Sequence, residues 1–201
     1  DCQAHHRPFC TGMEVAARVE NEGLPHPPSA DADLASRPGV CRRAQGIWNQ
    51  LDEDQKREAR ACYYASISEI DAQFGRVIDY LEEAGELDNT IVVMCADHGD
   101  LLGAHGLFFK DISAFEEVYQ VPLIVRGPGI AKDAVCQGRV GLHDLCPTLL
   151  ELADGEPIDA PDSRSFTGLL REPAMVADEW TRGYAEYFGN RHRLTQRVVW
   201  D

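Results

Sequence analysis

An apolar run of strand length, residues 91–95, is followed almost at once by the polar sequence Asp97-His98-Gly99-Asp100. Because the run is apolar throughout, with no polar alternation, it predicts a strand that is buried on both faces, as in a parallel sheet. In open α/β sheets, ligands bind just beyond the carboxyl ends of such strands. The carboxylate of Asp97 suits a hard cation such as calcium or magnesium, and the imidazole of His98 also admits manganese. The run therefore predicts a divalent metal site at the strand end.

A lysine follows the strand end at a distance that suits a shared site. Lys110 comes twelve residues after His98, beyond a loop that contains Gly103 and Gly106. A metal ion and a lysine ammonium can together stabilise the negative charge that develops when an anionic ester is cleaved. His105 lies within the loop and is a candidate proton donor, although a loop histidine is more often a packing residue. An Asp before a Gly is often a turn former, but the combination favours hydrolysis of an anionic ester.

Five blocks of the sequence, in the same order, resemble the sulfatases of the alkaline-phosphatase superfamily, specifically the bacterial type that includes phosphonate monoester hydrolases and choline sulfatases. The blocks are residues 63–71 with Gly75, residues 88–93, residues 97–106 with Lys110, residues 121–129 and residues 144–153. The resemblance implies that Asp97 and His98 are two ligands of a divalent cation, calcium ahead of manganese and magnesium, and that Lys110 binds the sulfate or phosphonate group. Residues 5–9 resemble the family's Pro-His-x-Pro-Phe segment, with His5 in place of the proline, which implies that His6 contacts the ester.

The resemblance also implies parts that the sequence lacks. The family's nucleophile is a formylglycine made from a Cys-x-Pro-x-Arg or Ser-x-Pro-x-Arg signature, and an N-terminal Asp-Asp pair supplies further metal ligands. The signature follows none of the seven cysteines, which are Cys2, Cys10, Cys41, Cys62, Cys95, Cys136 and Cys146. We therefore expect the second part of a sulfatase, inactive alone, with the formylglycine on preceding sequence.

Two classes of function remain open at this point. The first is a metal-dependent hydrolase of a small-molecule sulfate ester, with a phosphonate or phosphate diester as the alternative substrate. The second is a truncated or divergent, non-catalytic sulfatase-like protein that performs no turnover or serves as a partner of another chain. The upstream reading frame separates the two classes, because only the first requires the Asp-Asp pair and the formylglycine signature.

Charge and cysteine content exclude several other classes. A net charge of −15 argues against nucleic acid or an anionic membrane as a partner. No apolar run reaches the roughly 20 residues of a membrane span, and no signal peptide opens the sequence. Seven cysteines without a Cys-x-x-Cys pair indicate neither a disulfide framework nor a structural zinc site. Cytoplasm and periplasm both remain open, as does a homo-oligomer of the full-length protein.

Helical periodicity is strongest after Asp52. Asp52 and Gln55 form a capping-box pattern, and apolar residues recur every three or four positions until Gly85, which predicts one long amphipathic helix. Residues 1 to about 50 are proline-rich with little periodicity, which predicts loop. The other expected elements are a helix over 114–119 with Glu116 and Glu117 on its polar face, a strand over 121–125, a helix from its N-cap Asp144 through Ala153, and a hairpin of 183–188 with 195–200.

Alternating strands and helices predict an α/β sandwich with a mostly parallel sheet. The resemblance makes this fold alkaline-phosphatase-like and incomplete. Residues 1–172 would form the C-terminal part of the catalytic α/β domain, and residues 173–201 the start of a small C-terminal antiparallel sheet. We expect the strand at 91–95 to lack neighbours, so that sheet edges and apolar surface are exposed.

Overall fold

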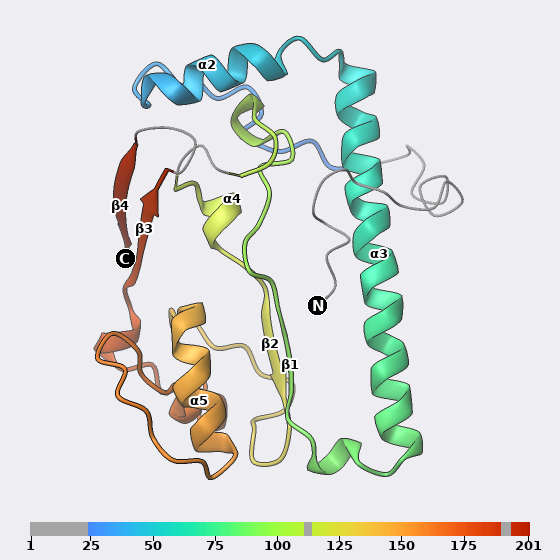
Figure 1. The fold of residues 1–201 in the computed structure, drawn as a ribbon, viewed down its shortest axis with the longest axis vertical. Helices are drawn as coiled ribbons and strands as arrows, with labels where there is room; N and C mark the ends of the chain where they lie inside the picture. The colour runs from blue at the N-terminus through green and yellow to red at the C-terminus, as the bar shows by residue number, and fades with distance from the viewer. Residues whose placement is uncertain (1–23, 111–113, 190–193) are drawn as a thin grey trace.

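A computed structural model describes residues 24–110, 114–189 and 194–201 (Figure 1). The helices are α2 (Gly39–Trp48), α3 (Glu53–Glu83), α4 (Glu116–Tyr119), α5 (Leu145–Leu152) and α6 (Thr167–Arg171). The strands are β1 (Val92–Cys95), β2 (Leu123–Arg126), β3 (Gly183–Phe188) and β4 (Thr195–Trp200), and short 3-10 turns are η1 (Leu87–Asn89), η2 (Ala104–Gly106), η3 (Leu142–Asp144) and η4 (Asp178–Trp180). In Figure 1, α2 lies across one end of the molecule, α3 runs along one side, and β3 and β4 lie on the other.

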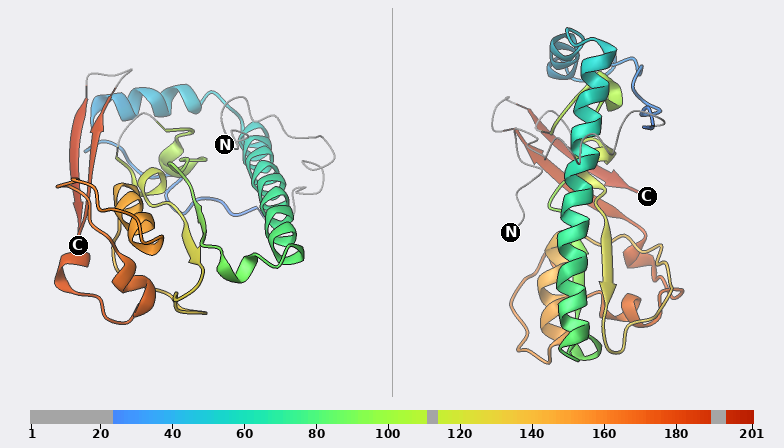
Figure 2. Two further views of the ribbon diagram at one scale, coloured as in Figure 1. Left: turned by 60° about the horizontal axis from the view of Figure 1, so that its bottom comes forward. Right: turned by 90° about the vertical axis from the view of Figure 1, so that its right-hand side faces the viewer.

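The long helix α3 confirms the prediction from sequence. Asp52 is its N-cap, and the capping box forms as expected: Gln55 N donates to Asp52 Oδ1 at 2.8 Å, and Asp52 N donates to Gln55 Oε1 at 3.0 Å. The helix ends just before Gly85, whose φ of +70° suits glycine. Figure 2 shows α3 extending along most of the molecule.

Both described sheets are two-stranded and antiparallel. β1 pairs with β2, with Val92 opposite Arg126 and Cys95 opposite Leu123. The hairpin of β3 and β4 has the predicted bounds. The mostly parallel sheet is therefore not found among the described residues, because the chain after β1 turns back through α4 and returns beside β1 in the opposite direction. An apolar run predicts burial but says nothing of the direction of its neighbour.

Strand β1 is also less buried than its sequence predicts. Its first three residues are half-buried and Cys95 is exposed. Ile124 on β2 is 60% exposed. The expected exposure of apolar surface around this strand is confirmed for these residues.

One hydrophobic core joins three segments that are far apart in the sequence: α2, the loop after β1, and α4. Its buried members are Leu34, Val40, Cys41, Leu101, Ala104, Leu107, Phe115 and Val118, with Ala44 and Trp48 of α2 packed against them. The prediction of loop before residue 50 is wrong for α2. Val40, Cys41, Ala44 and Trp48 recur at helical spacing, and this short amphipathic pattern is the signal that the sequence reading missed.

A second core forms where α5 and α6 meet the segment around Trp180. Its buried members are Phe166, Leu169 and Trp180. The guanidinium of Arg164 lies 3.8 Å from the centre of the Trp180 ring, and its Nη2 donates to the carbonyl oxygen of Glu179. This cluster packs α5 and α6 against the segment around Trp180.

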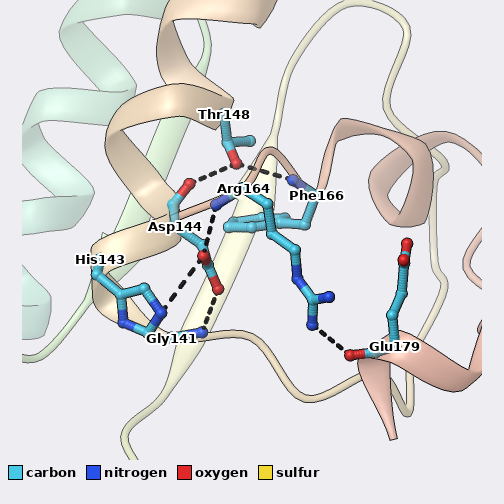
Figure 3. A network of polar contacts seen from close by, with 7 residues as sticks. All are labelled: Gly141, His143, Asp144, Thr148, Arg164, Phe166 and Glu179. Carbon is cyan, nitrogen blue, oxygen red and sulfur yellow. Dashed lines mark hydrogen bonds and ion pairs between the residues drawn. The ribbon is translucent and has the colours of Figure 1, made fainter. Parts of the chain in front are cut away.

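The buried carboxylate of Asp144 connects the second core to the start of α5 (Figure 3). Gly141 N donates to Asp144 Oδ2 at 2.9 Å and Arg164 N donates to Oδ1 at 3.0 Å. Thr148 Oγ1 donates to the Asp144 carbonyl at 2.6 Å and accepts from Phe166 N. The predicted helix is confirmed as α5 with Asp144 at its N-cap position, but the Asp144 side chain makes no capping hydrogen bond. Its side chain binds a distant segment instead.

Candidate metal and anion site

The predicted metal-binding pair lies together just beyond the end of β1. His98 N donates to Asp97 Oδ1 at 3.0 Å, and Asp97 Oδ2 lies 3.5 Å from His98 Nε2. The side chain of Asp97 is 58% exposed, whereas that of His98 is 22% exposed. A carboxylate and an imidazole therefore meet at the molecular surface, where an ion could reach both.

The hydrogen bond of His98 to Gly99 determines which nitrogen of the ring carries the proton. His98 Nδ1 lies 2.8 Å from the carbonyl oxygen of Gly99. A carbonyl oxygen can only accept, so Nδ1 carries the proton and donates. When the ring is neutral, Nε2 then has the lone pair. Nε2 is thus the nitrogen of His98 that could bind a metal ion.

Lys110 reaches the same nitrogen. Its Nζ contacts His98 Nε2, although the two residues are twelve positions apart. The ammonium donates to the lone pair that a metal ion would use. The structure therefore brings together Asp97, His98 and Lys110, as the sequence predicts.

The loop between His98 and Lys110 is closed by Asp100. Its Oδ1 accepts from Leu102 N at 2.8 Å and from Phe109 N at 3.1 Å, and Leu101 N donates to the Phe109 carbonyl at 3.1 Å. The two ends of the loop are thereby tied side by side. Lys110 returns to the strand end because the residue before it is fixed to Asp100.

Tyr63 of α3 is a neighbour of the site that sequence reasoning left without a role. Burial raises the pKa of its phenol, and the negative charges of Asp100 and Asp97 raise this pKa further. Periodicity places Tyr63 on a helix but cannot tell which loop the helix faces. Only the tertiary structure brings it close to these carboxylates.

The two other candidate residues have different outcomes. The ring of His105 stacks on Phe115, with centroids 4.5 Å apart, and its Nε2 lies 3.1 Å from Glu117 Oε1. Glu117 was interpreted as part of a polar helix face, so this contact was missed. His6 lies outside the described residues.

Asp97 and His98 fit a metal ion as part of a ligand set. Across residues 24–110, 114–189 and 194–201, no three His, Cys, Asp or Glu side chains gather as a metal site would require. Calcium takes six to eight oxygen ligands and magnesium about six. The pair therefore has the chemistry of metal ligands, but the described residues add no third His, Cys, Asp or Glu side chain to it.

Comparison with known proteins identifies the family. The family model named Sulfatase matches residues 23–155, which is more than half of the chain. The chain belongs to the sulfatase family. This family is part of the alkaline-phosphatase superfamily, in agreement with the resemblance seen in the sequence.

The similar proteins include a sulfatase and a multifunctional protein of the alkaline-phosphatase superfamily. The chain is 35% identical over 184 residues to the multifunctional alkaline phosphatase superfamily protein PehA of Trinickia caryophylli, covering 83% of this chain and 36% of the relative. It is 42% identical over 110 residues to a choline-sulfatase of Rhizobium meliloti, covering 51% of this chain and 20% of that protein. The chain thus spans about a third of the first relative's length and a fifth of the second's.

Solved structures share the fold. A protein in complex with its substrate D-glucosamine-2-N,6-O-disulfate superposes with a TM-score of 0.79 at 19% identity, covering 98% of this chain and 53% of that chain. The phosphonate monoester hydrolase of Silicibacter pomeroyi gives a TM-score of 0.70 at 29% identity, covering 81% of this chain and 34% of that chain. The chain therefore shares its fold with parts of both proteins.

Proposed function

We propose that this chain supplies part of the active site of a metal-dependent sulfate ester hydrolase. The observation that carries the proposal is the meeting of Asp97, His98 and Lys110 beyond the end of β1. The three residues are two potential metal ligands and one cation that can hold an anion. Membership of the sulfatase family supports the same reaction class.

In this proposal Asp97 and His98 hold a divalent cation, most readily calcium, with manganese or magnesium as alternatives. When bound, the cation polarises an ester oxygen as a Lewis acid. The Gly99 carbonyl keeps Nε2 of His98 available for it by holding the proton on Nδ1. The lone pair of Nε2 serves one partner at a time, so Lys110 must turn from the imidazole toward the anion.

Lys110 is proposed to hold the oxygens of the ester group while negative charge moves onto the leaving oxygen. Asp100 supports this task by fixing the residue before Lys110. The formylglycine nucleophile and the other metal ligands are proposed to lie on further sequence. In that longer protein, the edge of β1 that pairs with no described strand would receive the neighbours of a mostly parallel sheet.

A phosphonate or phosphate diester is the second candidate substrate. The observation that favours it is the 29% identity to a phosphonate monoester hydrolase over 81% of this chain. The charge and tetrahedral shape of the two ester groups are close enough for the same cation and lysine to bind either. Rates on a chromogenic sulfate ester and a chromogenic phosphonate ester would separate them.

The test is Lys110→Ala in the longer protein that contains these residues. We expect kcat/KM for a sulfate ester to fall by the equivalent of roughly 3 kcal/mol, as for the loss of one preorganised charge partner. Bound metal should not fall, because an ammonium is not a ligand and its loss removes a competitor for the Nε2 lone pair of His98. Lys110→Arg should recover only part of the activity, because a planar guanidinium cannot replace a compact charge without moving the anion.

Lys132→Ala is the matched control, because this lysine is exposed and is not part of the proposed site. It should leave both activity and metal content unchanged. A Lys110→Ala protein with near-normal kcat/KM would contradict the proposed role of the loop. Enzymatic turnover by the purified 201-residue chain would contradict the proposal that its nucleophile lies elsewhere.

A further inference from the structure

We propose that Glu117 is a positioning residue, which anchors His105 and so holds the loop of residues 99–110 in the shape that brings Lys110 to His98. The proposal rests on the proposed function only for the meaning of the Lys110 position. The structural claim itself concerns contacts between α4 and the loop.

The carboxylate of Glu117 connects two segments that are distant in sequence. His105 Nε2 lies 3.1 Å from Glu117 Oε1 and 3.3 Å from Oε2. Ser29 Oγ donates to Glu117 Oε1 at 3.1 Å. The side chain of His105 is only 16% exposed and its ring stacks on Phe115. A charged acceptor in such a half-buried place contributes more than an exposed ion pair does.

The backbone of His105 needs this support. Its φ is +56°, in the left-handed region that costs a non-glycine residue roughly 1 kcal/mol. Its N donates to the Ser29 carbonyl at 2.9 Å, and its carbonyl accepts from Gln45 Nε2 at 3.0 Å. Backbone and ring of His105 are thus both fixed by residues outside the loop. Unfavourable backbone conformations persist only where the surroundings hold them in this way.

Helix α4 also contacts the other end of the loop. Gly99 N donates to the Val118 carbonyl at 2.8 Å, and a Cβ at Gly99 would lie 2.0 Å from the carbonyl oxygen of Glu117. Glu117 therefore meets the loop twice, through its backbone beside His98 and through its carboxylate at His105. Between these two contacts Leu101 is 2% exposed. Movement of the His105 turn would be transmitted to Lys110, because Asp100 ties both sides of the loop together.

In this arrangement His105 acts by holding the loop in place. Its Nε2 is occupied by Glu117 and its Nδ1 lies on a ring that stacks on Phe115. A proton donor must reach the leaving group of the substrate, and a ring that is 16% exposed, with one face on Phe115 and Nε2 on Glu117, is poorly placed to do so. We therefore treat His105 and Glu117 as one positioning pair.

The experiment uses the 201-residue chain and compares Glu117→Ala, Glu117→Gln and the control Glu116→Ala, an exposed neighbour on the same helix. The readouts are the ¹⁵N NMR signals of the His98 ring and the hydrogen exchange of the loop amides. Lys110→Ala gives the reference signals for a His98 ring without its lysine contact. Urea unfolding of each variant separates local opening from a loss of global stability.

Glu117→Ala should speed the exchange of the Leu101 and His105 amides by about tenfold beyond any global effect, and should move the His98 signals toward those of Lys110→Ala. Glu117→Gln should recover most of both effects, since its amide oxygen still accepts from Ser29 and His105. Glu116→Ala should match the wild type. Ser29→Ala removes one partner alone, should act in the same direction to a smaller extent, and decides the matter if Glu117→Ala does not fold.

The proposal is overturned if Glu117→Ala leaves the His98 signals and loop exchange unchanged, or if Glu116→Ala changes them equally. It is also overturned if Lys110→Ala does not alter the His98 signals, because the contact to be positioned would then be absent. These measurements need no hydrolysis. A failure here is therefore distinct from a failure of the sulfatase proposal, which the activity of Lys110→Ala tests.

Discussion

The loop that follows β1 and the distal half of α3 bury their apolar side chains very differently. In the loop, Leu101 and Leu107 are 2% and 0% exposed, and α2 and α4 pack against them. On α3, Val77 and Tyr80 are 56% and 70% exposed, and Ile124 on β2 is 60% exposed. The candidate site thus has its own hydrophobic core. The apolar side chains of the distal half of α3 and of β2, in contrast, are exposed in the described structure.

The two regions therefore differ in how far the described residues alone fix their side chains. The loop is held by contacts with the segment around Ser29, with α2 and with α4, and Leu194 also packs against its core. The solved structure with the TM-score of 0.79 is about twice as long as the part matched here. The exposed apolar side chains of α3 and β2 are therefore the ones whose substitution should cost least.

The largest difference between the two regions should appear on truncation of a core side chain. Leu107→Ala should lower the free energy of unfolding by about 4 kcal/mol, because a fully buried leucine leaves a cavity. Val77→Ala should change it by less than about 0.5 kcal/mol, since the side chain is exposed on a helix. Urea unfolding of both variants tests this. Equal losses would show that the α3 surface is covered.

The same substitution should also have opposite signs in the two regions. Gly99→Ala should destabilise by about 3 kcal/mol, because its Cβ would meet the backbone of α4 at 2.0 Å. Gly75→Ala lies within α3, where a Cβ would have no neighbour within 4 Å. It should stabilise by up to about 1 kcal/mol through helix propensity. Thermal unfolding compares the two, and a tolerated Gly99→Ala would remove the close contact between loop and helix.

The Asp144 network tests whether the second core is equally self-contained. Asp144→Ala should destabilise by about 2 kcal/mol, because the backbone N–H groups of Gly141 and Arg164 lose their acceptor. The exposed Asp162→Ala is the control and should be neutral. Urea unfolding measures both. An Asp144→Ala protein with an unchanged free energy of unfolding would show that these hydrogen bonds do not stabilise the second core.

The smallest effect concerns pH and Tyr63. Burial and the charges of Asp100 and Asp97 raise its folded-state pKa above the usual value of about 10. The protonated phenol of Tyr63 contributes to the free energy of unfolding through this raised pKa. The contribution is fully present below pH ~10 and is lost as pH rises through the folded-state pKa. Tyr63→Phe should remove that part of the alkaline loss, and Tyr80→Phe should not. Unfolding free energies at pH 8 and pH 11 give the comparison.

Local signals predicted the elements that depend on neighbours in sequence. The capping box of Asp52 and Gln55, the stop at Gly85 and the bounds of the hairpin all agree with the structure. Helix α2 was missed because its apolar pattern is short and lies in a proline-rich stretch. The mostly parallel sheet that the alternation of strands and helices predicts was not found among the described residues. Strand direction depends on the path of the chain between strands, which local patterns do not encode.

At the site, the sequence alone determined which residues gather at the end of β1. A strand that ends in Asp97 and His98, followed by a glycine loop to Lys110, encodes their proximity in short-range spacing. Only the tertiary structure decided the contacts of His105 with Glu117, of Glu117 with Ser29, and of Asp144 with Arg164. The contact of His105 with Glu117 spans the same twelve positions as that of Lys110 with His98, but no strand end marks it, and the other two contacts span 88 and 20 positions. Packing of the whole chain was needed to bring them together.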